Sequence, residues 1–293
     1  MRSFQGVLDS MKGGGTLLPL LDDYLISLDT VDEAHSHRFI SPSGLFGCKR
    51  SVAFRMMGVS RDVSVNPRLR RIFDTGSGVH EQIQGYLSEA GLLKVVEAPV
   101  FNLALKTMGH TDGLLELSPF EISVLEIKSI NTDEFNRLKE PKAQHRFQGN
   151  TYMFFLEVVR RRVNSCKSAK EAMDMLWGEY KQMLDTFVEG GRKRTKEEKM
   201  SWNKACLEEV VNYFWGKVRP IRKVIFYYYD KNTSDHKEFI IEWDDATIAD
   251  IICECQSINA YVEEGVMPPR LEGATGKSFS GCRYCDYKYS CFS

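Results

Sequence analysis

The pattern of hydrophobic positions changes from helical to strand-like in the middle of the chain. Residues 66–91 carry Val79, Ile83 and Leu87 at helical spacing, which predicts a helix, a brief break and a second helix. Three runs rich in strand-forming residues follow, separated by Gly, Pro and Ser signals: LKVVEAPVFNLAL, MGHTDGLLEL and ISVLEIKSI. A helical pattern returns at residues 142–161.

The second half of the chain adds helices and one more pair of strands. Residues 163–219 are charged and helical in pattern, with an interruption at EGGRKRTKEEKM, which predicts a helical insertion with an exposed turn. RKVIFYYYD and HKEFIIEW predict paired strands joined by the turn residues KNTS, and residues 245–263 predict a helix. This order of elements predicts an α/β fold with a mixed sheet and large helical additions.

The ends of the chain differ from this core in pattern. Residues 1–40 predict a poorly defined arm with one short helix, and residues 41–58 predict a Ser cap followed by a helix. We therefore expect an N-terminal arm (1–40) and a single domain (41–293) that carries the insertion at 163–219.

Composition and charge restrict the class of protein. The chain has 293 residues, of which 43% are hydrophobic and 27% charged, as in ordinary globular proteins. Its net charge is −1, so any nucleic-acid surface has to be a local basic patch. The N-terminus lacks the apolar run of a signal peptide, and no segment approaches a membrane span of about 20 apolar residues. We expect a cytoplasmic protein with no membrane partner.

Candidate chemistry gathers in the strand-like runs. Asp112 lies in one run, and Glu126 and Lys128 lie in the next as EIK. Residues i and i+2 of a strand face the same side, so Glu126 and Lys128 project together, away from Leu125 and Ile127. A hairpin of the two strands would bring Asp112 beside them. Two carboxylates suit a hard divalent cation such as Mg²⁺ or Mn²⁺, which can activate water and neutralise charge on a phosphate.

The alternative is an ion pair on the solvent face of a hairpin, and two further features bear on the choice. Gln148 and Tyr152 share a helix face at i and i+4, where an amide and a phenol can hydrogen-bond a phosphate or nucleotide. His80 lies at the edge of an apolar helical stripe, where a half-buried imidazole needs a partner. Each feature alone also fits ordinary packing.

The cysteines raise a separate question. Eight cysteines in a chain expected to be cytoplasmic argue against a disulfide framework. Three of them, Cys282, Cys285 and Cys291, lie in the last twelve residues, one short of the four thiolates of a closed metal site. Spacing alone does not choose the fourth among Cys48, Cys166 and Cys206.

Taken together and in order, these motifs resemble the PD-(D/E)xK nuclease superfamily. Within it they resemble the RecB-like iron–sulfur branch, which includes the nuclease domain of the AddB helicase–nuclease subunit and the CRISPR-associated four-cysteine exonucleases. The residues that carry the resemblance are Cys48, His80, Asp112, Glu126, Lys128, Gln148, Tyr152, Cys282, Cys285 and Cys291. The resemblance covers about residues 41–155 and 220–293. Asp112 follows Thr111 where the superfamily's name has Pro, and Gln144 is a second candidate for the helix glutamine.

The resemblance implies a restriction-endonuclease-like core and a set of roles. The implied ligands of a catalytic Mg²⁺ or Mn²⁺ are His80, Asp112, Glu126 and the backbone carbonyl of Ile127. The implied catalytic residues are Asp112, Glu126, Lys128, Gln148 and Tyr152, with Lys128 as the catalytic lysine and the last two as the QxxxY motif of the branch.

The resemblance also selects Cys48 as the fourth ligand of a [4Fe–4S] cluster, with Cys282, Cys285 and Cys291 from a C-terminal segment at 270–293. Zinc is the alternative, but structural zinc sites usually combine two close cysteine pairs, which this spacing fits poorly. Cys48 and the tail lie more than 230 residues apart, so a cluster would close a long loop and couple metal binding to folding.

Local basic clusters offer candidate nucleic-acid contacts. They are Lys49-Arg50 with Arg55, Arg68 with Arg70-Arg71, Arg160–Arg162, Arg192–Arg194, and Arg219 with Arg222-Lys223. Such clusters are often solvated helix faces, but Lys49 and Arg50 adjoin the implied cluster ligand and are the best candidates. Phosphate contacts of this kind give affinity without sequence specificity.

The expected function is a metal-dependent DNA exonuclease that acts on single strands or DNA ends. Such an enzyme suits recombination, repair, or phage or CRISPR DNA processing, with protein partners from those systems. The alternatives are a catalytically inactive DNA-binding or assembly subunit of the same fold, an endonuclease, and an RNase.

Overall fold

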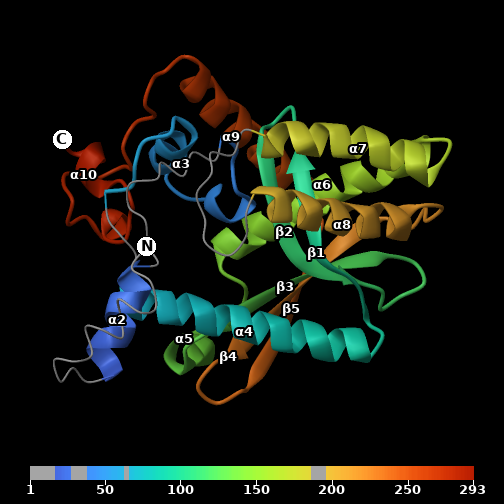
Figure 1. Cartoon of the computed structure of the whole chain (residues 1–293), viewed down its shortest axis with the longest axis horizontal. Coiled ribbons are helices and arrows are strands. Elements are labelled where there is room, and N and C mark those ends of the chain that lie inside the picture. Colours follow the sequence, from blue (N-terminus) through green and yellow to red (C-terminus); the bar gives the residue numbers. More distant parts are fainter. Residues whose placement is uncertain (1–16, 28–37, 63–65, 186–195) are drawn as a thin grey trace.

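A computed structural model describes residues 17–27, 38–62, 66–185 and 196–293. Its centre is a five-stranded sheet in the order β1-β2-β3-β4-β5 (Figure 1). The strands are β1 Leu93–Asn102, β2 Thr107–Leu115, β3 Ile122–Ile130, β4 Ile221–Asp230 and β5 His236–Glu242. β3 and β4 are parallel, and the other neighbours are antiparallel. The expected α/β class, with a mixed central sheet flanked by helices, is confirmed.

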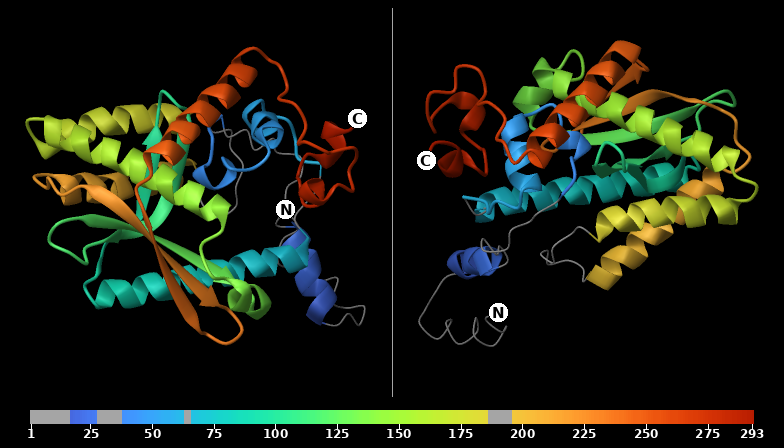
Figure 2. Two further views of the ribbon diagram at one scale, coloured as in Figure 1. Left: turned by 180° about the vertical axis from the view of Figure 1, so that it is seen from behind. Right: turned by 90° about the horizontal axis from the view of Figure 1, so that it is seen from above.

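Helices cover both faces of this sheet (Figures 1 and 2). The long helices are α4 Pro67–Glu89, α6 Ala143–Ser165, α7 Ala169–Leu184, α8 Lys196–Phe214 and α9 Asp245–Glu263. The short ones are α2 Leu17–Ser27, η2 Pro42–Gly44, α3 Lys49–Met56, α5 Thr132–Arg137, η3 Ser280–Cys282 and α10 Lys288–Cys291. Helix α4 packs on one face of the sheet, whereas α6, α7 and α8 share a core with the other.

Strand alternation divides the side chains of β3 between the two faces. Leu125 and Ile127 pack with α4, while Val124 joins the core under α6. Because successive side chains of a strand point to opposite sides, Glu126 and Lys128 face α6, as predicted. The sheet thus separates the residues that α4 brings to the site from those that α6 brings.

Helix α4 is continuous, so the predicted break near residue 76 is wrong. Asn66 caps its start by accepting a hydrogen bond from the Leu69 amide at 2.8 Å. Gly76 lies inside the helix, and a Cβ there would be 3.4 Å from Ser129 Oγ of β3. Packing against the sheet outweighs the low helix propensity of glycine here.

Two other predicted boundaries shift. Ser41 precedes the short η2 helix rather than the main helix, which begins at Lys49 with Cys48 as its N-cap residue. The expected insertion at 163–219 forms α7, α8 and the end of α6, and its buried residues Leu176, Tyr180 and Val210 belong to the main core. Helix α8 packs against β1, so this segment forms part of the protein's interior.

Two expectations fall wholly or partly outside the described residues. Of the expected arm at 1–40, the structure describes α2 and residues 38–40. The expected turn at EGGRKRTKEEKM and the cluster Arg192–Arg194 lie largely at residues 186–195, which are not described. Among the described helices, none is both long and apolar enough to span a membrane.

We predict that the close approach of α6 to β4 tolerates only glycine at position 149. A Cβ there would lie 2.7 Å from Val224 Cγ1 and 2.9 Å from a ring carbon of Phe226. Gly149→Ala should lower the free energy of unfolding by about 1–3 kcal/mol through overpacking. In contrast, Gly85→Ala on α4, with no atom within 4 Å of its Cβ, should raise it by about 0.5–1 kcal/mol. Urea unfolding measures both, and a Gly149→Ala variant as stable as wild type contradicts the prediction.

Candidate active site and cysteine cluster

The site forms where β2 and β3 separate. These strands pair at three positions, from Gly113 opposite Leu125 to Leu115 opposite Ser123. Beyond them, Asp112 Oδ2 accepts a 2.5 Å hydrogen bond from the Ile127 amide. The Asp112 side chain therefore connects the two strands beyond their last backbone pair. It places a carboxylate at the point where the strands diverge, which we call the β2–β3 fork.

Helix α4 brings His80 to the same carboxylate. His80 Nδ1 lies 2.8 Å from Asp112 Oδ1, so the half-buried imidazole has the partner that its position required. Burial by itself lowers the pKa of His80, but the hydrogen bond and charge of Asp112 outweigh it, and the pKa is raised. Asp112 thus uses one oxygen for α4 and the other for β3.

A second set of contacts lies on the α6 face of β3. Lys128 Nζ donates to Glu126 Oε1 at 2.6 Å and to Gln148 Oε1 at 3.0 Å. Gln148 Nε2 donates in turn to Glu126 Oε1 at 2.9 Å and to the Tyr152 hydroxyl at 2.7 Å. Gln148 and Tyr152 are both buried, so they hold the Glu126–Lys128 pair in place.

Glu126 is the most perturbed acid of the site. Its side chain is buried, with 4% of the residue exposed, and this burial raises its pKa to about 7. The Lys128 ammonium opposes the shift and the nearby Asp112 charge adds to it. Both hydrogen bonds that the described residues give this carboxylate end on Oε1, which leaves Oε2 for a further partner.

The structure adds Gln84 and Glu97, which the sequence reasoning missed. Gln84 Nε2 donates to the Asp112 carbonyl at 2.9 Å and to Glu97 Oε1 at 3.0 Å. Glu97 lies between the β1 positions that pair with Gly113 and Thr111, with a φ of 52° that is rare for a residue with a side chain. The i, i+4 spacing of His80 and Gln84 on one helix face was the one available signal for Gln84.

Of the two helix glutamines, Gln148 reaches the site. Gln144 is exposed, and its amide nitrogen lies 3.3 Å from His145 Nε2. The neighbouring His145 is buried, with Nδ1 2.6 Å from the Tyr228 hydroxyl. Burial, together with the charges of Lys128 and Lys142, lowers the pKa of His145 to about 3, so this imidazole is neutral.

The side chains at the β2–β3 fork are of the types that bind divalent cations. Within the described residues, no group of three or more His, Cys, Asp or Glu side chains is arranged to hold a metal ion. Protein hydrogen bonds instead occupy His80 Nδ1, both Asp112 oxygens and Glu126 Oε1. Nevertheless, two carboxylates and an imidazole that interact electrostatically are a donor set suited to Mg²⁺ or Mn²⁺.

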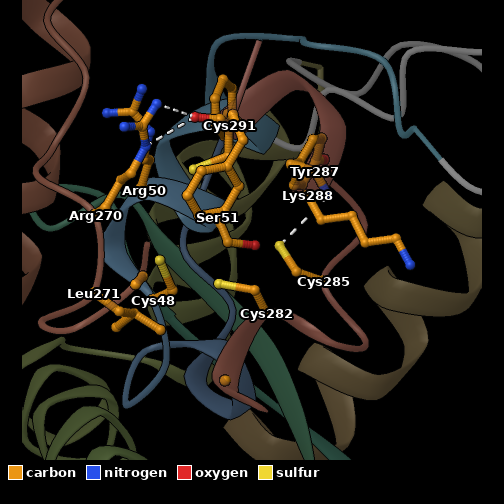
Figure 3. A pocket seen from close by; sticks show the side chains of 14 residues that line it. Cys48, Arg50, Ser51, Arg270, Leu271, Cys282, Cys285, Tyr287, Lys288 and Cys291 are labelled. Atoms are coloured by element: carbon orange, nitrogen blue, oxygen red, sulfur yellow. Dashed lines mark hydrogen bonds between the residues drawn. The ribbon is translucent and has the colours of Figure 1, made fainter. Parts of the chain in front are cut away.

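The four implied cluster cysteines line one pocket. Cys48 stands before α3, and Cys282, Cys285 and Cys291 come from the C-terminal segment (Figure 3). Burial raises the pKa of the Cys282 thiol, and the other three sulfurs raise it further. Remote parts of the chain thus contribute four thiols to the lining of one pocket, but in the part of the chain that the structure describes no group of three or more Cys, His, Asp or Glu side chains is arranged to hold a metal ion.

The remaining cysteines lie elsewhere. Cys206 is buried on α8 and Cys166 ends α6, and none of the eight cysteines, all of which lie in the described part of the chain, forms a disulfide. On α9, Cys255 is buried and Cys253 is exposed, so these two cysteines at i and i+2 face different directions.

Hydrogen bonds also tie the tail to the α3 region. The Asp62 carboxylate accepts from the amides of Tyr289 and Ser290, at 2.5 and 2.8 Å. Within the C-terminal segment itself, Arg270 donates to the Cys291 carbonyl through two nitrogens, at 2.9 and 2.6 Å (Figure 3). The ring of the buried Tyr287 stacks on Phe54 of α3, with centroids 5.4 Å apart.

The basic residues beside Cys48 have partners within the protein. Lys49 forms an ion pair with Glu254 of α9 at 2.8 Å, and Arg50 donates to the Pro268 carbonyl at 2.7 Å. Binding of DNA by Lys49 and Arg50 remains a prediction, and it would compete with these contacts.

An open cleft of about 610 Å³ adjoins the site through His80. Its lining comes from α4, β1, the end of β3 and the start of the β4–β5 turn. The lining residues are Ile72, Phe73, Gly76, Ser77, His80, Glu81, Gln84, Glu97, Ser129 and Lys231.

Comparison with known proteins finds similarity in structure alone. No protein-family model matches the chain, and no curated protein matches its sequence. An alkaline exonuclease (LHK-Exo) from Laribacter hongkongensis is 13% identical, covers 83% of this chain and 93% of its own, and has a TM-score of 0.43. LHK-Exo in complex with dAMP is 16% identical, covers 79% of this chain and 91% of its own, and has a TM-score of 0.44. The protein SSO0001 is 13% identical, covers 93% of this chain and 95% of its own, and has a TM-score of 0.43. The function proposed below depends on the residues of this chain.

We predict that Glu126 makes the metal-free protein less stable as pH rises. Its folded-state pKa of about 7 lies above the ordinary 4.5, so the stabilisation present at acidic pH is lost as pH rises toward and through 7. With a chelator present, the free energy of unfolding should fall by up to about 3 kcal/mol between pH 4.5 and 8, compared with Glu126→Gln. His80 titrates in both proteins, but the Glu126 charge helps to raise the pKa of His80, so the difference reports Glu126 together with this interaction. Equal pH dependence in urea unfolding contradicts the prediction.

Proposed function

We propose that this protein is a metal-dependent DNA nuclease that hydrolyses phosphodiester bonds in single strands or at DNA ends. The observation that carries the proposal is the buried arrangement at the β2–β3 fork, where Asp112 joins His80 and Glu126 joins Lys128 and Gln148. Four elements, α4, β2, β3 and α6, contribute these groups, and each group has a defined partner. Carboxylates, an imidazole and an ammonium in one place suit catalysis on a phosphodiester.

Burial distinguishes this arrangement from an ion pair on a solvent face. Glu126 is 4% exposed, and this burial raises its pKa to about 7. Removing a carboxylate and an ammonium from water carries a desolvation cost that a simple surface pair avoids. Perturbed acids of this kind concentrate at functional sites, which favours a catalytic role.

The proposed metal ligands are His80, Asp112, Glu126 and the backbone carbonyl of Ile127. A bound Mg²⁺ or Mn²⁺ would supply positive charge against the negative charge that develops on the phosphate, and would favour ionised Glu126. Lys128 Nζ adds positive charge on the same face of β3 and can orient water or a phosphate oxygen. Gln148 and Tyr152 keep Lys128 and Glu126 in position through their buried hydrogen bonds.

The alternatives retain the fold but change the activity. A non-catalytic DNA-binding or assembly subunit would not need the complete set of Asp112, Glu126 and Lys128. Offering single-stranded DNA and RNA of one sequence tests for an RNase, and a circular single strand tests for an endonuclease. We also propose that the protein acts in recombination, DNA repair, or the processing of phage or CRISPR DNA, together with protein partners from those systems.

We predict that the wild-type protein degrades end-labelled single-stranded DNA with Mn²⁺ or Mg²⁺ and not with a chelator. Asp112→Asn and Lys128→Met should each lower the rate at least about 100-fold, because each removes charge from the site. Asp174→Asn is the matched control, since this exposed α7 carboxylate pairs with Lys170 far from the fork. Undegraded DNA with well-folded, metal-supplied wild-type protein, or equal rates in all variants, contradicts the nuclease proposal.

We also propose that Cys48, Cys282, Cys285 and Cys291 hold a structural [4Fe–4S] cluster. The support is their convergence on one pocket and the absence of a second close pair that zinc sites usually have. Such a cluster would fasten the C-terminal segment to α3 across more than 230 residues of chain. Its contribution would add to that of the Asp62 hydrogen bonds.

We predict that anaerobically purified wild-type protein absorbs near ~400 nm, as iron–sulfur proteins do. Cys48→Ala and Cys282→Ala should lose this absorption, lower the melting temperature and reduce nuclease activity indirectly. Cys253→Ala is the control, because this exposed thiol lies on α9 outside the pocket. Colourless protein that contains stoichiometric zinc would show that the four cysteines bind zinc and not an iron–sulfur cluster. An unchanged melting temperature in Cys282→Ala would refute the structural role of the cluster.

A further inference from the structure

The cleft beside His80 has a wall that the proposed chemistry does not use. Along α4, Leu69, Ile72 and Phe73 are exposed at 37, 39 and 54%, and the last two line the cleft. Residues three and four apart on a helix share a face, so these side chains form one apolar row that leads toward His80. Large apolar side chains in exposed rows mark binding surfaces more often than isolated ones do.

Small residues line the α4 side of the cleft between this apolar row and His80. Gly76 and Ser77 line the cleft one turn after Phe73, and neither side chain extends far from the helix. His80 comes one turn later and bonds Asp112, so the cleft passes one side chain away from the Asp112 carboxylate. A ligand that lies along this wall from Phe73 would therefore reach the proposed catalytic groups.

The charges of the lining favour bases over phosphates. Glu81 and Glu97 contribute carboxylates, and Lys231 contributes an ammonium. Two carboxylates against one ammonium repel a run of phosphates, so this lining differs from the local basic patch that the net charge led us to expect. Carboxylate oxygens instead accept hydrogen bonds from base amino groups. An exposed aromatic ring stacks on any base, because every base has a π-face. Lys231 can pair with a single phosphate.

We propose that this cleft binds the bases of an unpaired DNA strand, with Phe73 as the stacking platform, and delivers that strand to His80 and Asp112. A cleft of about 610 Å³ is small compared with a duplex, and in a duplex the base faces are covered by their neighbours. The cleft therefore selects unpaired strands and frayed ends. This inference rests on the proposed function for its substrate, and its test measures binding separately from cleavage.

The experiment uses a single-stranded oligonucleotide with one 2-aminopurine near an end, with Ca²⁺ in place of Mg²⁺. Stacking quenches the probe, and a titration gives Kd. Phe73→Ala should weaken binding about 10-fold and abolish the quenching, because one stacked base is lost. Phe73→Trp should retain both. Tyr86→Ala is the matched control, since Tyr86 is an aromatic residue on α4 with 59% exposure that does not line the cleft.

Wild-type Kd and quenching in Phe73→Ala would overturn the proposal, as would an equal loss in Tyr86→Ala or equally tight binding of a blunt duplex by the wild type. Melting temperatures check that each variant is folded, and exposure of Phe73 makes its replacement compatible with the fold. Phe73-dependent quenching without cleavage in Mn²⁺ would support the cleft and refute the nuclease. Cleavage by the wild type with no effect of Phe73 on binding would refute the cleft alone.

Discussion

The carboxylate of Asp112 is the interaction on which the site depends. Its two oxygens engage the imidazole of His80 on α4 and the amide of Ile127 on β3, while Gln84 holds its carbonyl. Backbone pairing joins β2 to β3 at only three positions, so this side chain secures the strands where they diverge. An unpartnered amide at Ile127 would cost about 1–3 kcal/mol, which gives Asp112 a structural as well as a chemical role.

The α6 side of the site balances opposing electrostatic effects. Burial disfavours the Glu126 charge and the Lys128 ammonium favours it, with the result that the carboxyl has a pKa near neutrality. A buried ion pair is weak evidence of a stabilising role, because desolvation offsets much of the attraction. The hydrogen bonds of Gln148 fix both partners in one geometry.

The C-terminal segment packs against the start of the domain, near α3. Asp62 and the stacked pair of Phe54 and Tyr287 hold it through ordinary protein interactions. The pocket that receives Cys48 and the tail cysteines lies among these contacts. Protein contacts therefore position the C-terminal segment without a cofactor. A bound cluster would reinforce this arrangement.

Local periodicity by itself determined which side chains share a face. The period of two put Glu126 and Lys128 opposite Leu125 and Ile127, and the i, i+4 spacing put Gln148 and Tyr152 on one side of a helix. Both relations depend only on backbone geometry, so the sequence contained them. It also predicted the five strands, since their runs are separated by clear turn residues.

Only the tertiary structure decided which of these faces meet. It made α4 continuous through Gly76, because packing on β3 overrides local propensity, and it brought Gln148 rather than Gln144 to the site. It also added Glu97 and placed Cys48, and neither Cys166 nor Cys206, beside the tail cysteines. These outcomes depend on contacts between residues far apart in the chain, where spacing carries no information about distance.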